Sequence, residues 1–222
     1  MLRDWIAPLS PAEFMTTQLG RGPWAQPGIA SGSLGALDWP VLARVLAVGA
    51  DTIVCAKGEQ LPYPVPRDLD ELRAYMRMGI GLAMRHTERA DAGLRAVAAS
   101  FADLPGTPQV QVFVTPAETH GFGWHYDLEE VFIAQTAGVK DYYFRANTVE
   151  LDTPFPPRDF SAFHRETSPL MTATLVAGDF LYLPSRWWHM ALCRETSLSI
   201  SVGLMAPDAY FAGTGSEIRS LW

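Results

Sequence analysis

Cysteine is scarce in this sequence, which contains Cys55 and Cys193 and no others. Two cysteines cannot build the disulfide framework of a small secreted protein, nor a zinc site with several thiolate ligands. Free thiols are instead typical of proteins kept in the reducing cytoplasm. The cysteine content therefore predicts a cytoplasmic protein without disulfide bonds.

Long apolar runs are also missing. No stretch approaches the roughly 18 consecutive apolar residues that indicate a membrane-spanning helix. The N-terminal segment, residues 1–14, contains an acidic residue and a proline where a signal peptide needs an apolar run. We therefore predict that the protein does not associate with membranes and carries no secretion signal.

Positive charge is in deficit, with 17 basic against 24 acidic residues, a net charge of -7 and a sequence pI of about 5.2. A general nucleic-acid binder or a protein that binds anionic membranes needs a basic surface, so both classes are disfavoured. A basic peptide partner remains compatible with this charge. Hydrophobic residues at 48% and charged residues at 18% predict a compact globular protein rather than a disordered chain.

The first half of the chain has mainly helical patterns. Ser10 precedes a proline and Glu13, a typical helix start, and glycines at 20 and 22 end that segment. Apolar residues at helical spacing predict further helices over 38–48, 67–86 and 91–104, the second of them interrupted near Gly79 and Gly81. The β-branched segment 52–56 predicts a strand that joins the sheet formed by the second half.

From about residue 105 the pattern changes to short strands separated by Gly, Pro, Asp and Asn. The expected strands are 110–115, 131–136, 140–144, 172–176, 179–184 and 196–204. Segments 136–140 and 176–180 read as tight hairpin turns. Many short strands with turn residues between them indicate an antiparallel double-sheet jelly roll. We predict a mainly β protein with one domain over 1–222: a helix-rich region 1–105, a jelly-roll core 106–206 and a C-terminal tail 207–222.

Three histidines are followed two residues later by an acid, and their contexts differ. His86 and Glu88 lie at the end of a predicted helix, where residues i and i+2 do not face each other, so we expect an exposed, solvated pair. His164 and Glu166 lie in a charged, proline-bounded loop. Neither histidine is predicted to bind a metal.

His125 and Asp127 directly precede the strand 131–136. In extended chain, residues i and i+2 point to the same side, so both side chains can converge on one ion. His189 follows the apolar segment 178–183 and a proline, which predicts a histidine at a strand end, in the mouth of a barrel. These two histidines and one carboxylate form a set that binds non-haem Fe(II) on one face. A zinc site with the same ligands and hydrogen-bonded core histidines are the alternatives.

The segment GFGWHYDLEEVFIAQTAGVK, residues 121–140, resembles the JmjC-type, cupin-fold 2-oxoglutarate oxygenases, most of all their ribosomal-oxygenase and asparaginyl-hydroxylase branches. The positions that match the family pattern are His125, Asp127, Phe132, Gln135, Gly138 and Lys140. GDFLYLPSRWWH, residues 178–189, resembles the segment that carries the second histidine, and SLSISVGLMAP resembles the closing strand. The resemblance covers about 105–206 and implies a double-stranded β-helix that uses Fe(II), 2-oxoglutarate and O2.

The resemblance gives Lys140 a role, because the family uses this position to pair with the far carboxylate of 2-oxoglutarate. A dicarboxylate in a mostly apolar barrel needs such a cation. In the strand before the metal pair, Gln111 and Phe113 stand where the family often has Asn and Tyr. Gln111 can still donate a hydrogen bond, whereas Phe113 cannot. Ser199 or Thr136 is expected to supply a further donor.

Several residues beside the metal ligands are candidates for substrate contact. Glu129 and Glu130 are expected to be solvated acids on a loop, with recognition of a basic substrate group as the alternative. Of the neighbours Trp187 and Trp188, one is expected in the core and the other against the substrate. We take Trp124 and Trp187 as the candidate substrate residues.

The function implied by the resemblance is hydroxylation of an amino-acid side chain in a peptide or protein. The ribosomal branch carries further domains after the barrel, whereas this sequence stops at Trp222, which favours oxidation of a small metabolite as the alternative. A non-enzymatic, metal-binding cupin is a third hypothesis, disfavoured by Lys140. The sequence does not identify the substrate or the oligomeric state.

Overall fold

The computed structural model describes residues 1–148 and 165–205, and two antiparallel sheets form its centre. The large sheet has the strand order β1-β9-β6-β11-β5-β4-β2-β3 and the small sheet the order β10-β7-β8. The strands are β1 (Trp24–Gln26), β2 (Asp51–Ala56), β3 (Glu59–Gln60), β4 (Gly81–Arg85), β5 (Thr107–Thr115), β6 (Glu130–Ala137), β7 (Lys140–Arg145), β8 (Met171–Leu175), β9 (Phe180–Leu183), β10 (Trp188–Cys193) and β11 (Ser197–Met205). The predicted mainly β jelly roll is confirmed.

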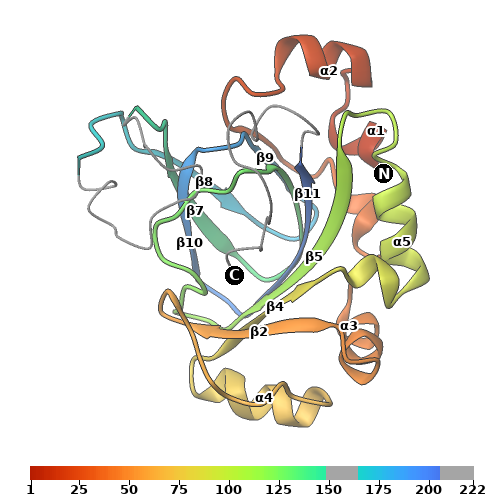
Figure 1. The fold of residues 1–222 in the computed structure, drawn as a ribbon, viewed down its shortest axis with the longest axis vertical. Helices are drawn as coiled ribbons and strands as arrows, with labels where there is room; N and C mark the ends of the chain where they lie inside the picture. The colour runs from red at the N-terminus through yellow and green to blue at the C-terminus, as the bar shows by residue number, and fades with distance from the viewer. Residues whose placement is uncertain (149–164, 206–222) are drawn as a thin grey trace, which may run out of the picture.

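The helices lie outside the large sheet, on the side away from the small sheet, as Figure 1 shows for α1 and α5 beside β5. They are α1 (Leu2–Trp5), α2 (Pro11–Thr17), α3 (Trp39–Ala47), α4 (Leu69–Arg77) and α5 (Ala92–Ala99), with single 3-10 turns at Ser31–Ser33 and Thr87–Arg89. The predicted start of α2 is confirmed, because Ser10 and Glu13 form a reciprocal capping box. Within the described ranges, none of these helices is long and apolar enough to cross a bilayer.

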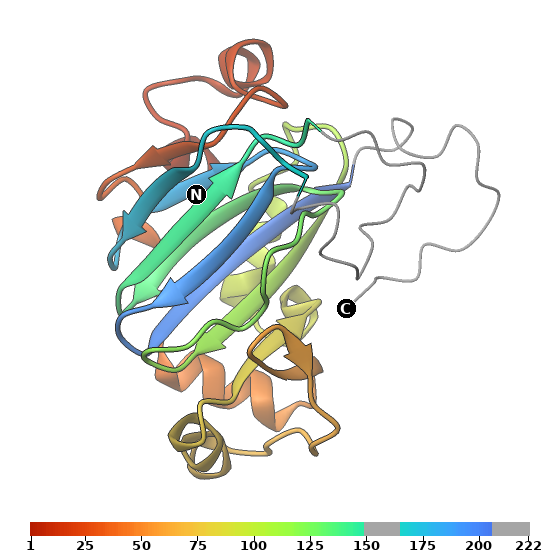
Figure 2. The same cartoon turned by 90° about the vertical axis from the view of Figure 1, so that its left-hand side faces the viewer.

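Strand alternation divides the large sheet into two chemically different faces. On β5, Val110, Val112 and Val114 belong to the main hydrophobic core with the helices. The intervening Gln111 and Phe113 face a cavity between the sheets. The same alternation holds on β11 and β6, and Figure 2 shows these strands lying next to one another across the molecule. One face of the sheet is therefore devoted to stability and the other is available for chemistry.

The N-terminal half contributes strands to the same large sheet. The strand expected over 52–56 is confirmed as β2. The helix expected over 67–86 is wrong beyond α4, because residues 81–85 form strand β4, between β2 and β5. A Cβ atom on Gly81 would lie 2.4 Å from the Val114 carbonyl oxygen, so the glycine permits a close approach of two strands. The sheet thus extends across the change in composition near residue 105. The proposed tail, 207–222, lies outside the described residues.

Two turns that the sequence predicts as hairpins instead carry the chain from one sheet to the other. Segment 136–140 connects β6 in the large sheet to β7 in the small sheet, and segment 176–180 connects β8 to β9 in the opposite direction. Gly138 and Gly178 adopt φ of 71° and 96°, a region that glycine enters without steric penalty. Turn residues were recognised correctly, but they do not reveal which strands pair.

The strand expected over 179–184 is confirmed as β9, but His189 does not lie at its end. β9 ends at Leu183, and β10 begins at Trp188 in the small sheet. Arg186, between them, has φ of 64°, which reverses the chain. His189 is therefore the second residue of a strand rather than the end of one.

Asp141 on β7 joins the three strands of the small sheet. Its carboxylate accepts a hydrogen bond of 2.5 Å from Thr174 on β8 and bonds of 2.6 and 2.9 Å from Arg194, which follows β10. The Arg194 guanidinium lowers the pKa of Asp141. A lowered carboxyl pKa contributes stability above the ordinary pKa, and this contribution is lost as the pH falls.

We expect Asp141→Asn to lower the free energy of unfolding by about 1–2 kcal/mol at pH 7, a modest value because Arg194 is largely exposed. Urea unfolding should show the difference beginning to shrink below about pH 4, where the carboxyl of the unfolded chain binds a proton, and disappearing as the pH falls through the lower pKa of the folded protein. Asp70→Asn, which removes an exposed carboxylate paired with Arg73, is the control and should change stability by less than about 0.5 kcal/mol. Equal losses in the two variants would contradict this role of Asp141.

Candidate metal centre and its pocket

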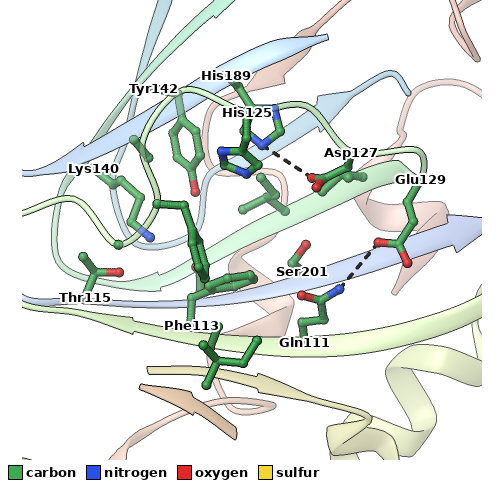
Figure 3. Close-up of a pocket in the computed structure, with 18 of the residues that line it drawn as sticks. Gln111, Phe113, Thr115, His125, Asp127, Glu129, Lys140, Tyr142, His189 and Ser201 are labelled. Carbon is green, nitrogen blue, oxygen red and sulfur yellow. Dashed lines mark hydrogen bonds and ion pairs between the residues drawn. The ribbon is translucent and has the colours of Figure 1, made fainter. Parts of the chain in front are cut away.

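A cavity lies between the two sheets, lined by inward-facing residues of β2, β4, β5, β6, β7, β10 and β11 and by the loop 121–129 (Figure 3). The cavity and its open mouth together enclose about 830 Å³, part of which is open solvent. His125, Asp127, Lys140 and His189 all line it. The fold therefore brings together residues from the loop before β6, from β7 and from β10.

Two backbone hydrogen bonds place the predicted metal ligands side by side. The His125 N–H donates to the His189 carbonyl at 3.1 Å, and the His189 N–H donates to the His125 carbonyl at 2.7 Å. The Arg186 N–H donates to the Asp127 carbonyl at 2.7 Å. As a result, one ligand atom from each of His125, Asp127 and His189 lies within 4.8 Å of the others.

Each imidazole is oriented by a backbone carbonyl. Nδ1 of His125 lies 2.7 Å from the Gly123 oxygen, and Nδ1 of His189 lies 2.9 Å from the Trp187 oxygen. A carbonyl only accepts, so both Nδ1 atoms carry the proton, and Nε2 is the nitrogen of each ring that can bind a metal. Burial, helped by the nearby His189, lowers the pKa of His125 to about 4, which keeps it in the neutral form that binds metals.

These three side chains fit a divalent metal. Adjacent ligands about 2.1 Å from one ion lie about 3 Å apart, and Nε2 of His189 is 3.5 Å from Oδ2 of Asp127. His189 lies on β10, and His125 is held beside it by the backbone bridge between the two residues. Two imidazoles and one carboxylate on a single face match the donor set of non-haem Fe(II) sites.

Lys140 lies deep in the same cavity. It is 4% exposed, and its ammonium lies 5.8 Å from the centre of the Tyr142 ring. The Tyr142 hydroxyl interacts with both Lys140 and Ser199, and burial raises the pKa of this phenol, so it remains protonated. Among the described residues, no carboxylate forms an ion pair with Lys140. The result is a buried cation with hydroxyl donors beside it.

The sequence analysis missed Tyr142. It lies two residues after Lys140 on β7, and strand alternation alone places it on the same face. Thr136, considered as a further donor, donates to the Leu198 carbonyl at 3.3 Å and does not line the cavity. Ser199 does line it, close to Tyr142.

Gln111 lines the cavity but lies away from Lys140. Figure 3 shows it beside Glu129, across the pocket from Lys140. Its amide nitrogen is 3.3 Å from Oε1 of Gln109 and 3.5 Å from Oε2 of Glu129. The expected contact between Gln111 and the co-substrate therefore has no support from its position near the other end of the pocket.

The two glutamates after the metal pair are not the solvated acids that the sequence led us to expect. Glu129 lines the cavity, where burial and then the Asp127 carboxylate raise its pKa to about 7. Glu130, at the start of β6, accepts a hydrogen bond from the Tyr182 hydroxyl, away from the cavity lining. Loop position indicated exposure, but the loop folds inward against β11.

The candidate substrate tryptophans do not reach the cavity. Trp188 is the core member of the 187–188 pair and packs edge-on against Tyr126 at 4.9 Å between ring centres. Trp124 packs against the same two residues. Trp187 lies near Gly22, and neither Trp124 nor Trp187 is among the lining residues. Phe113 and Phe122 provide the aromatic wall instead, at 6.4 Å between ring centres.

The remaining histidine-acid pairs lie outside the metal cluster in the described chain. The His86 ring contacts the Gln109 amide, and Glu88 accepts from the Val110 N–H at 3.0 Å. This pair is therefore partly buried and not fully solvated, because β5 passes beside it. His164 lies outside the described residues. Glu166 is buried, and its carboxylate accepts a hydrogen bond from the Thr148 N–H.

Comparison with known proteins places these features in a family. The model of a family described as "JmjC domain" matches residues 84–211. The bifunctional lysine-specific demethylase and histidyl-hydroxylase NO66 of Drosophila pseudoobscura pseudoobscura is 38% identical over 98 residues, which cover 43% of this chain and 10% of that protein. Ribosomal oxygenase 1 of Gallus gallus is 25% identical over 219 residues, covering 91% of this chain and 36% of the relative.

Solved structures share the fold at low sequence identity. The X-ray structure of Escherichia coli ycfD gives a TM-score of 0.70 at 15% identity and covers 96% of this chain and 61% of that one. YcfD in complex with cobalt and 2-oxoglutarate gives a TM-score of 0.67, also at 15% identity, over 96% of this chain and 60% of that chain. The chain thus spans less than two thirds of the length of each of these relatives.

We expect Asp127→Ala and His189→Ala to weaken Mn(II) binding by more than about 100-fold. Each variant removes a direct ligand, and losing only the hydrogen bonds that orient a ligand already costs about 10- to 100-fold. Electron paramagnetic resonance of free Mn(II) during titration measures this directly. His86→Ala is the matched control and should bind Mn(II) as the wild type does. Retention of tight binding in both ligand variants would show that the metal lies elsewhere.

Proposed function

Because the chain belongs to the JmjC domain family, we propose that it is an Fe(II)- and 2-oxoglutarate-dependent oxygenase that hydroxylates an amino-acid side chain of a peptide or protein. The observation that carries the proposal is the presence of two complementary features in one cavity. The cavity is lined by a His-Asp-His metal set and by a buried lysine that, among the described residues, has no carboxylate partner.

In this proposal His125, Asp127 and His189 hold the iron. When bound, the iron and 2-oxoglutarate supply the oxidising chemistry with O2, and the protein supplies position and environment. The backbone bonds between the two histidines fix their relative place before the metal arrives. Such preorganisation keeps the ligand set on one face and leaves the other positions for co-substrate and oxygen.

Lys140 receives the far carboxylate of 2-oxoglutarate. A buried ammonium without an acidic partner is unfavourable, and a bound dicarboxylate supplies the missing charge. Tyr142 and Ser199, which meet near Lys140, are placed to donate hydrogen bonds to the same carboxylate. The apolar residues Ile133 and Phe113 on the cavity wall limit the access of water.

A protein or peptide substrate is supported by the names of the relatives, one called a histidyl-hydroxylase and another a ribosomal oxygenase. The experiment is a screen of peptides and free amino acids with Fe(II), 2-oxoglutarate and O2, reading succinate formation and a mass gain of one oxygen. Turnover of peptides supports the proposal. Turnover of free amino acids alone would move the function to small-molecule oxidation, and no succinate with any substrate would refute an oxygenase.

We expect Lys140→Ala to weaken 2-oxoglutarate binding by roughly a hundred- to several-thousand-fold, since breaking a buried charge pair from one side costs about 3–5 kcal/mol. Anaerobic titration of the Fe(II)-loaded protein, followed by its charge-transfer absorption, gives the dissociation constant. Metal affinity should hardly change, because the three ligands are untouched.

Lys57→Ala is the matched control for this experiment, because Lys57 is exposed on the turn between β2 and β3 and does not line the cavity. It should bind 2-oxoglutarate normally. Lys140→Arg should retain part of the affinity, because it keeps the charge. An unchanged dissociation constant in Lys140→Ala would mean that the co-substrate is anchored by another group.

A further inference from the structure

The carboxylate of Glu129 is a second charged group inside the cavity, and the proposed chemistry does not use it. Figure 3 shows it beside Gln111, on the opposite side of the metal ligands from Lys140. It is not part of the cluster formed by His125, Asp127 and His189. A partly buried acid in this position needs a separate explanation, because charged groups withdrawn from water are usually paired.

The fold makes specific room for this side chain. Gly203 on β11 lies directly against it, and a Cβ atom at Gly203 would be 2.1 Å from Oε2, 2.5 Å from Cδ and 2.9 Å from Oε1 of Glu129. No other residue type fits at position 203 unless the carboxylate moves. The loop after Asp127 thus seats Glu129 against the backbone of a central strand, where it remains in contact with the cavity.

Glu129 has little to satisfy it within the described residues. The Gln111 amide donates to its carboxylate over a long 3.5 Å, and no described lysine, arginine or histidine forms an ion pair with it. Arg85 also lines the cavity, but its guanidinium is paired with Asp51 at 2.6 Å. The carboxylate therefore faces the cavity with most of its acceptor capacity available.

We propose that Glu129 is a specificity-determining residue that accepts a cationic group of the substrate, an ammonium or a guanidinium. This proposal rests on the proposed oxygenase function and adds to it the charge of the side chain that enters the pocket. Opposite charge and charge-assisted hydrogen bonds select such a group over a neutral one of the same shape. The anionic co-substrate is drawn to Lys140 at the other end of the cavity and repelled from Glu129.

A pair of small probes tests the charge preference directly. Butylguanidinium and N-butylurea have nearly the same shape and differ in charge. Their dissociation constants are measured by saturation-transfer nuclear magnetic resonance on the full chain loaded with Zn(II) as a diamagnetic metal. We expect the wild type to prefer the cation by about tenfold or more and Glu129→Gln to bring the ratio close to one.

Two further variants sharpen the result. Glu59→Gln removes an exposed glutamate on β3 outside the cavity lining and should keep the preference. Gly203→Ala should lose it, because the added methyl displaces the Glu129 carboxylate. Thermal unfolding of each variant confirms that the fold is intact.

The proposal is overturned if the wild type binds both probes equally, binds neither, or keeps its preference in Glu129→Gln. Failure of the proposed function has a different signature. If the wild type takes up no metal, the oxygenase assignment fails, and the same probe comparison on the metal-free protein still tests Glu129, since Asp127 is common to both proteins. Metal uptake without charge discrimination refutes only the role of Glu129.

Discussion

The reciprocal backbone hydrogen bonds between His125 and His189 are the contact on which the site depends. They join the loop before β6 to strand β10, so that residues far apart in the sequence become neighbours. Because the bonds use backbone atoms, both imidazoles stay free to be oriented by the Gly123 and Trp187 carbonyls. The ligand set therefore follows from strand pairing and needs no side-chain bonds to hold it together.

A positive and a negative side chain lie at different ends of the pocket. Lys140 and Glu129 lie on opposite sides of the metal ligands (Figure 3). Both side chains point into the cavity. The Tyr142 hydroxyl lies beside Lys140, and the missing side chain of Gly203 leaves room for Glu129. Under the proposed function, one end of the cavity attracts an anion and the other a cation, so co-substrate and substrate enter without competing for the same place.

Strand alternation explains why part of the site was predictable from the sequence. His125 and Asp127 precede a strand at a spacing of two, and the structure brings them together with His189 as expected. Pairing partners were not predictable, because turn residues at 136–140 look the same whether the next strand returns to its own sheet or crosses to another. The position of the Glu129 side chain inside the cavity was not predictable for a similar reason. It needs the space left by Gly203, which is distant in sequence.

The position of β11 in the large sheet has a consequence for how the protein is made. β11 is the last strand of the described chain, yet it lies in the middle of the sheet, between β5 and β6. Until it is synthesised, β5 and β6 have no shared neighbour, and their edges stay unpaired. Such long-range pairing gives a high contact order and slow folding. β5 can pair with β4, and β6 with β9, before β11 exists, but these two halves of the large sheet join only once β11 has been made.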